Sequence, residues 1–162
     1  MRQILCRTLV ALATVVIVAG SAGAADKRPL PASRVQTVDG ASLTLDQAGP
    51  ESRVYVYVLP GSTTSARLLT ALRDWQLEHI GQVTLVVGGP RETAVAFAAA
   101  NHGLQGVQWL IDADRAFWTD MQITGVPTLF GVRGGVVEWR LAGVLNEPGA
   151  LKGVVSSWTT AP

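Results

Sequence analysis

Four consecutive hydroxyl side chains, Ser62 to Ser65, are the residues whose types and spacing could support chemistry. They follow Leu59-Pro60-Gly61, where a run of β-forming residues gives way to a helical pattern. A serine or threonine oxygen at a helix start accepts hydrogen bonds from free backbone N–H groups. A serine beside a suitable base can instead act as a nucleophile. Helix capping and nucleophilic catalysis are therefore the two chemistries to separate.

A serine nucleophile needs a base, and the chain contains only two histidines. His79 lies at the end of the helix that Ser62 begins, roughly 25 Å away at about 1.5 Å per residue. His102 precedes Gly103 at an expected helix end, where an imidazole complements the helix dipole. The segment around Ser62 also lacks the Gly-x-Ser-x-Gly pattern of a hydrolase elbow. The sequence argues against a serine hydrolase.

Metal and cofactor sites find no support in the residue pattern. The one cysteine, Cys6, lies near the N-terminus, and two separated histidines offer no recognisable ligand spacing. Helix capping and a solvated face explain Asp112, Asp114 and Asp120. Gly88-Gly89-Pro90 follows an expected strand but matches neither a dinucleotide-binding loop nor a Walker loop. We expect no metal and no cofactor.

Residues 1–24 are typical of a secretory signal peptide. Arg2 and Arg7 give a positive start, Leu9 to Val18 an apolar stretch, and Ala22-Gly23-Ala24 a small-residue cleavage site. The apolar stretch is shorter than the about 20 residues that a membrane span needs. We expect cleavage and a periplasmic location, with an uncleaved membrane anchor over residues 9–24 as the alternative.

Once this leader is removed, the chain is close to neutral and has no cysteine. The full sequence holds thirteen basic and twelve acidic residues, and two of the arginines lie in the leader. Phosphate binding needs a basic patch, so nucleic acid is not an expected partner. Hydrophobic residues make up 48% of the sequence and charged residues 15%, as in a single globular domain.

Residues 25–33 are polar and contain two prolines, so we expect a mobile linker that leads into a domain over residues 34–160. The domain opens with a hairpin signal. Val35–Val38 and Ser42–Leu45 flank Asp39-Gly40, and Asp-Gly supplies the positive φ values of a tight turn.

Further strands are expected where β-branched and aromatic residues gather: Val54–Leu59, Val83–Val87, Val107–Ile111, Thr128–Val132 and Val136–Leu141. Helical patterns separate them, and the last strand alternates so that Val137, Trp139 and Leu141 share one face. This order predicts an α/β fold with a central mixed β-sheet flanked by helices. An N-terminal β-hairpin and an inserted αβ unit complete it.

The order of elements, the signal peptide and two motifs resemble the extracytoplasmic thioredoxin-like proteins of the TlpA type, including the methylamine-utilisation accessory (MauD-like) thioredoxins. The resemblance covers about residues 34 to 158. One motif is the strand-to-helix turn where the family carries Cys-x-x-Cys; here Ser62 and Ser65 stand at those positions. The other is Thr124-Gly125-Val126-Pro127-Thr128, which is similar to the family's cis-proline loop. The resemblance implies a thioredoxin-like fold with a cis bond at Val126-Pro127.

The serines imply that redox function is lost, because a hydroxyl forms no disulfide and ionises far less readily than a thiol of pKa about 8.5. Many thioredoxins also carry a buried acid six residues before the first cysteine, and here that position holds Val56. The family holds extended peptides against the backbone of the residue before the proline. The resemblance therefore implies a redox-inactive protein that binds a periplasmic protein or peptide, as an accessory, maturation or scaffold factor.

The binding residues that the resemblance implies lie in two segments: Gly61, Ser62, Thr63, Thr64 and Ser65, and Val126 with Pro127. Helix capping explains the same hydroxyls equally well. Two further alternatives stay open. Ser62 could stabilise the thiolate of a bound thiol cofactor, as in serine-type glutathione transferases, or the chain could be a structural part of an envelope assembly.

Overall fold

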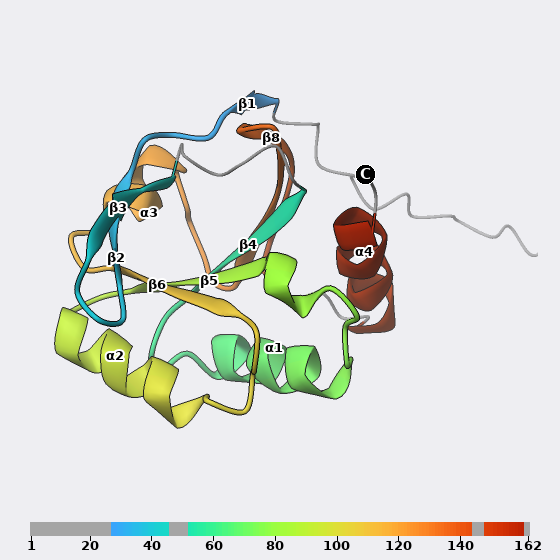
Figure 1. Cartoon of the computed structure of the whole chain (residues 1–162), viewed down its shortest axis with the longest axis horizontal. Coiled ribbons are helices and arrows are strands. Elements are labelled where there is room, and N and C mark those ends of the chain that lie inside the picture. Colours follow the sequence, from blue (N-terminus) through green and yellow to red (C-terminus); the bar gives the residue numbers. More distant parts are fainter. Residues whose placement is uncertain (1–26, 46–51, 144–147, 161–162) are drawn as a thin grey trace, which may run out of the picture.

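A mixed sheet runs through the part of the chain that the structure, a computed structural model, describes: residues 27–45, 52–143 and 148–160. Its strands are β1 (Arg28–Pro29), β2 (Arg34–Thr37), β3 (Ser42–Thr44), β4 (Arg53–Val58), β5 (Val83–Gly88), β6 (Gln108–Asp112), β7 (Thr128–Arg133) and β8 (Val136–Ala142). They lie in the order β1-β8-β7-β4-β5-β6-β2-β3 (Figure 1). The expected signal peptide lies outside the described residues.

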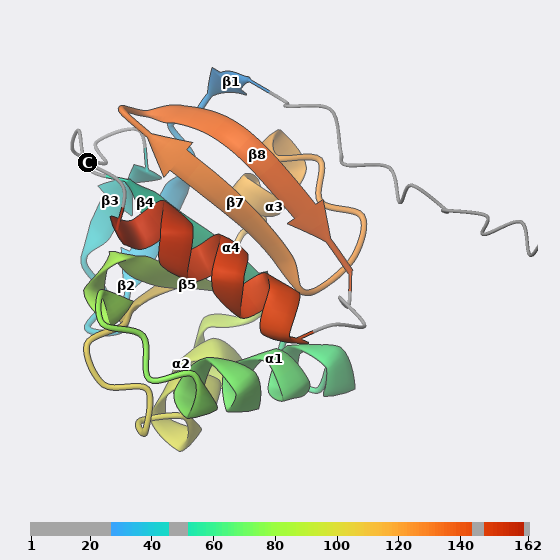
Figure 2. The ribbon, with the colours of Figure 1, turned by 90° about the vertical axis from the view of Figure 1, so that its right-hand side faces the viewer.

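Helices cover both faces of this sheet. They are α1 (Thr63–Asp74), α2 (Arg91–Ala100), α3 (Ala116–Asp120) and α4 (Pro148–Thr160), with a 3-10 turn, η2 (Ile80–Gln82). The core cluster on one face contains residues of α1, α2 and α4, whereas the cluster on the other face contains residues of α3 and of the N-terminal segment. Figure 2 shows α4 in front of the sheet, α1 and α2 below it, and α3 behind β7 and β8.

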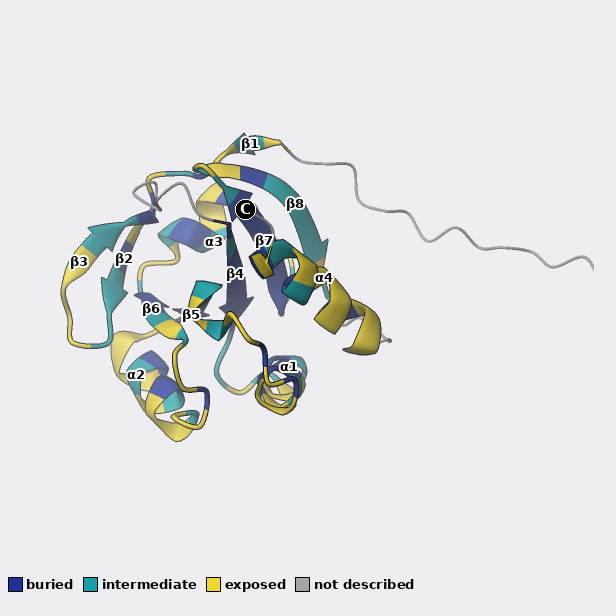
Figure 3. Cartoon of the chain, turned by 45° about the vertical axis from the view of Figure 1, so that its right-hand side comes forward, coloured by how far each residue is buried: buried dark blue, intermediate teal, exposed yellow. Residues whose placement is uncertain are grey.

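The central strand β4 is buried almost along its whole length, as Figure 3 shows. Val54, Val56 and Val58 face α1 and α4, and Tyr55 and Tyr57 face α3. Such two-sided burial explains the unbroken run of β-forming residues. β4 pairs in parallel with β5 and antiparallel with β7, so the expected α/β arrangement is confirmed.

The expected mobile linker is wrong for its described part. β1 pairs with β8, and the Leu30 N–H donates to the Gly135 carbonyl at 2.8 Å. The Leu30 side chain is only 4% exposed, and the Ser33 hydroxyl donates to the Asp120 carboxylate at 2.6 Å. Polar composition and prolines suggested a linker, but Pro29 lies on a sheet edge, where it need donate no ladder hydrogen bond.

The expected facing of the last strand holds for Trp139 and Leu141, which pack on the same cluster, but is wrong for Val137. The pairing of β7 with β8 shifts register between Gly131 and Val132, and Glu138 is the extra residue. The bulge places Val137 in the cluster below α3, while Trp139 packs on the opposite face beside Trp158 of α4. A β carbon built at Gly131 would overlap the Trp139 ring, so a glycine is needed there.

The first helix is shorter than its pattern predicts. It ends at Asp74, and Gln76 has a φ of 48°, a left-handed conformation that ends the helix before Leu77 and Ile80. Those two apolar residues instead pack from the following turn. Among the described residues, none of the helices has both the length and the apolar character for a membrane crossing.

Leu30 tests whether the N-terminal segment belongs to the fold. Leu30→Ala should lower the free energy of unfolding by about 2 to 5 kcal/mol, because it removes a buried side chain and leaves a cavity. Urea unfolding followed by tryptophan fluorescence measures the loss. Lys27→Ala, at an exposed neighbouring position, should change stability by less than about 0.5 kcal/mol. Equal stability of the two variants would show that the segment is not packed.

Candidate functional site

The register of β4 against β7 brings two loops together at one edge of the sheet. Tyr57 pairs with Thr128, so the chain that leaves β4 lies beside the chain that enters β7. The first of these segments carries Ser62 to Ser65 and the second carries Val126-Pro127, whose peptide bond is cis. The structure therefore gathers the two segments that the sequence singled out.

Ser62 begins α1 as its N-cap. Its Oγ accepts from the Ser65 N–H at 3.2 Å, and its carbonyl accepts from the Ala66 N–H at 3.0 Å. Gly61, just before it, is exposed and has a φ of 77°, which favours glycine. Helix capping is thus a real function of this serine, as its place in the sequence predicts.

Ser65 lies beneath the surface. Its side chain is fully buried, and its Oγ accepts from the Leu59 N–H at 3.2 Å. This bond ties the end of β4 to the first turn of α1. The expectation that the Ser65 hydroxyl contacts a partner is therefore wrong in this structure, because the side chain is not accessible. Of its neighbours, Thr63 is exposed, and Ser62 and Thr64 are half-buried.

Thr64 joins the two loops directly. Its Oγ1 donates to the Val126 carbonyl at 2.9 Å and lies 2.9 Å from Ser62 Oγ. A hydroxyl has one proton, and that of Thr64 is given to Val126. Ser62 must then be the donor of the bond between the two hydroxyls. The result is a directed chain from Ser62 through Thr64 to the Val126 backbone.

This chain restricts what Ser62 can do chemically. Its one proton is given to Thr64, whereas a nucleophile would give it to a base and a thiolate stabiliser would give it to sulfur. Neither histidine serves as a base at this site. His102 Nδ1 lies 3.1 Å from the Ala99 carbonyl at the end of α2, and His79 is exposed beside η2. The geometry argues against both enzymatic alternatives.

Metal ligation is not indicated either. In the stretches that the structure describes, no three His, Cys, Asp or Glu side chains are grouped so as to hold a metal ion. Asp112 and Asp120 are instead engaged in hydrogen bonds within the fold.

A buried polar network supports the loop that ends at Val126-Pro127, and local sequence patterns predict only part of it. Asp112 is fully buried, and its carboxylate accepts from the N–H groups of Phe117 at 3.2 Å and Trp118 at 3.0 Å. That is the helix capping expected of Asp112. The Tyr57 hydroxyl also donates to it at 2.9 Å, a contact across three strands that no local pattern reveals.

Gly88 makes this contact sterically possible. It pairs with Asp112 across the sheet, and a β carbon built on it would overlap the Tyr57 hydroxyl. Burial, together with the neighbouring Asp112 carboxylate, raises the pKa of Tyr57, and burial raises that of Tyr55. Both phenols therefore stay neutral in the folded protein.

Two arginines hold the other end of α3. Arg28 Nη2 donates to the Met121 carbonyl at 3.0 Å, and Arg140 Nη2 donates to the Gln122 carbonyl at 2.9 Å. Cations suit a helix C-terminus, where carbonyls are left without helical partners. Asp112 and the arginines together fix α3, which leads into the loop that ends at Val126-Pro127.

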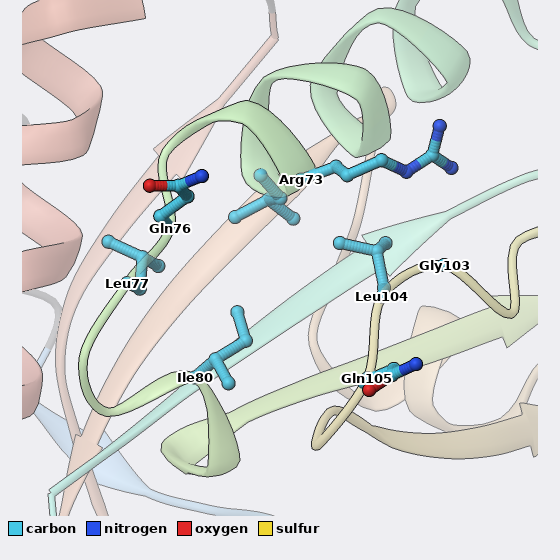
Figure 4. A pocket seen from close by; sticks show the side chains of 8 residues that line it. Arg73, Gln76, Leu77, Ile80, Gly103, Leu104 and Gln105 are labelled. Carbon is cyan, nitrogen blue, oxygen red and sulfur yellow. The ribbon is translucent and has the colours of Figure 1, made fainter.

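A separate surface pocket of about 200 Å³ lies at the opposite end of α1 (Figure 4). It is lined by Leu72, Arg73, Gln76, Leu77, Ile80, Gly103, Leu104 and Gln105. None of these residues belongs to the two loops of the site, so the pocket is not part of it.

The fold has many counterparts among solved structures. MTB dsbF superposes with a TM-score of 0.63 at 19% identity, over 79% of this chain and 96% of that one. A secreted disulfide oxidoreductase of Mycobacterium tuberculosis gives 0.61 at 16% identity, over 78% and 96%. The exposed lipoprotein thioredoxin Etrx1 of Streptococcus pneumoniae gives 0.57 at 14%, over 75% and 96%. The chain has a thioredoxin-like fold.

The likeness is one of structure, since no protein-family model and no curated protein sequence matches this chain. Its structural neighbours are thioredoxin-like disulfide oxidoreductases. In this thioredoxin-like chain, hydroxyls occupy the α1 start, and beyond Cys6 the sequence contains no cysteine.

Tyrosine ionisation tests the buried network. The two tyrosines of the chain, Tyr55 and Tyr57, both have raised pKa values. Above pH about 10 the unfolded chain loses tyrosine protons that the folded chain keeps, so stability present below that pH should fall as pH rises. Tyrosinate absorbance should appear only when the protein unfolds. Near-ultraviolet circular dichroism, recorded at the same pH values, measures the unfolding. Ionisation near pH 10 with native dichroism retained would contradict this burial.

Proposed function

We propose that this protein is an exported thioredoxin-like module without thiol–disulfide activity that binds an extended segment of a protein or peptide partner. The observation that carries the proposal is the hydrogen-bond chain from Ser62 through Thr64 to Val126. It joins the two loops of the site by hydroxyls, at the turn where the sequence resemblance implies that TlpA-type proteins carry their cysteines. The site is therefore built without a redox pair.

The absence of redox activity follows from chemistry. Disulfide exchange needs a thiolate, and no cysteine follows Cys6 in the sequence. Val56, at the position where many thioredoxins carry a buried acid, is fully buried among apolar side chains of the α1 face. The cysteine pair and the acid at this position are both replaced.

Peptide binding is supported by what the site leaves available. In the described part of the chain, the Val126 N–H donates to no acceptor, so a partner carbonyl can accept from it. Leu59, Trp118 and Val126 are half-buried and pack against the core cluster of the α3 face. One hydrogen bond adds only about 0.5 to 1.5 kcal/mol net, so apolar contacts must supply most of the affinity.

Export is proposed on two grounds. Residues 1–24 have the pattern of a signal peptide. Two structural neighbours are, by their own descriptions, a secreted oxidoreductase and an exposed lipoprotein thioredoxin. We propose an accessory or maturation role in the periplasm, like that of the MauD-like proteins that the sequence resembles.

Redox assays test the first half of the proposal. Purified protein should neither reduce insulin disulfides nor oxidise a reduced substrate, because serine cannot form the mixed disulfide. The double variant Ser62→Cys/Ser65→Cys is the positive control and should gain measurable turnover if the turn keeps its shape. Turnover by the wild-type protein in either assay would defeat the claim of inactivity.

Peptide selection tests the second half. Peptides selected on the wild-type protein from a random phage-displayed library should lose at least about tenfold in affinity for Thr63→Arg, which crowds the exposed edge of the site. The matched control is Thr160→Arg at the end of α4, which lies far from the site. The indole of Trp158, two residues earlier, donates to the carbonyl of Arg53 at the start of β4, whereas the site follows the end of β4. Equal affinity for both variants would place the binding surface elsewhere.

A further inference from the structure

The bond from Thr64 to Val126 occupies an acceptor that a partner strand would need. Two residues directly opposite each other in a hydrogen-bonded antiparallel pair exchange two bonds, each giving its N–H to the other's carbonyl. Val126 can give its own N–H, which has no acceptor in the described part of the chain. Its carbonyl already accepts from Thr64 Oγ1 at 2.9 Å. An incoming strand can therefore form one of the two usual hydrogen bonds with Val126, the one that the Val126 N–H donates.

The Thr64 hydroxyl is held in this orientation from both sides. Thr64 belongs to the first turn of α1, so its backbone is fixed by the helix. The Ser62 hydroxyl donates to its oxygen, which leaves the Thr64 proton directed at the Val126 carbonyl. Releasing the carbonyl would disturb a chain of two hydrogen bonds.

We propose that Thr64 makes this site selective for partner segments that place a proline opposite Val126. The inference rests on the proposed peptide-binding function. Any other residue at that position would bring a backbone N–H into the site without its usual acceptor, which is unfavourable when the group is desolvated. Proline has no backbone N–H, so it loses nothing there. It still offers a carbonyl to the Val126 N–H.

The apolar cluster to which Val126 belongs suits an apolar ring. Leu59 and Trp118 are half-buried and belong to the same apolar cluster as Val126. The Trp118 ring lies 5.4 Å from that of Tyr57, and its backbone N–H is held by Asp112, so it is fixed in place. A proline ring can pack there without bringing a charge or a donor to the surface.

Sharing of the carbonyl is the competing arrangement. A carbonyl oxygen has two lone pairs, and a partner N–H could in principle use the second while Thr64 keeps the first. In that case Thr64 would not affect which residue stands opposite Val126. The proline preference and its dependence on the Thr64 hydroxyl therefore separate the two arrangements.

The probes are the phage-selected peptides whose affinity falls for Thr63→Arg, each synthesised with alanine and with proline at every position in turn. On the wild-type protein, one position should bind proline at least as tightly as alanine. Thr64→Val removes the hydroxyl with little change of shape and frees the carbonyl. Alanine should then bind roughly three to ten times more tightly than proline at that position.

The quantity to compare is the ratio of proline to alanine affinity, measured on the wild-type protein and on Thr64→Val. The effect of proline on the stiffness of the free peptide cancels in this comparison, because the same peptides are used with both proteins. Thr64→Ser keeps the hydroxyl and should retain the wild-type ratio. An unchanged ratio in Thr64→Val, or the same shift in Thr64→Ser, would overturn the inference. If Thr64→Val does not fold, by circular dichroism, Thr64→Ala removes the same donor.

Failure of the inference can be told apart from failure of the proposed function. Peptides that lose affinity for Thr63→Arg but show no Thr64-dependent proline preference would leave the binding site standing and reject only the selectivity. Selected peptides that bind Thr63→Arg and Thr160→Arg equally would reject the site itself, and the inference with it.

Discussion

The antiparallel pairing of β4 with β7 is the constraint on which the rest of the molecule depends. β4 is buried on both faces, so its neighbours in the sheet must satisfy its backbone hydrogen bonds. With Tyr57 opposite Thr128, the end of one strand and the start of the other meet at one edge. A slip of one residue would turn every side chain of β4 to the other face. The site is therefore a consequence of the sheet register.

The hydroxyls at the α1 start form hydrogen bonds that thiols form only weakly. Ser65 accepts from the Leu59 N–H just after β4, Ser62 caps the helix, and Thr64 donates to the Val126 carbonyl. Each hydrogen bond stabilises the fold only modestly. Together they satisfy backbone groups at a strand end, a helix start and a loop that have no partner within secondary structure. Within the described residues the Val126 N–H has no acceptor, and the proposed peptide binding rests on this group.

Support for the loop comes from the other face of the sheet. A buried carboxylate is costly unless its oxygens are hydrogen-bonded, and Asp112 accepts from three donors. Arg28 and Arg140 satisfy the opposite end of α3. The N-terminal segment is thus part of the support. It supplies Arg28 to α3 and Leu30 to the core, although its composition is that of a linker.

Much of the fold could be predicted from the sequence, because strand runs, helix periodicity and caps are encoded within a few neighbouring residues. The β4 run, the Ser62 cap and the Asp112 cap are examples. The bulge at Glu138, the packing of Leu30, the burial of Ser65 and the bond from Thr64 to Val126 were not predictable. Each depends on which strands pair and in what register, and residues 62 apart meet only once that pairing exists. The sequence alone determined most of the elements and contains a single cysteine, whereas the tertiary structure decided which hydroxyls are buried and which backbone carbonyl Thr64 meets, because both depend on the strand register.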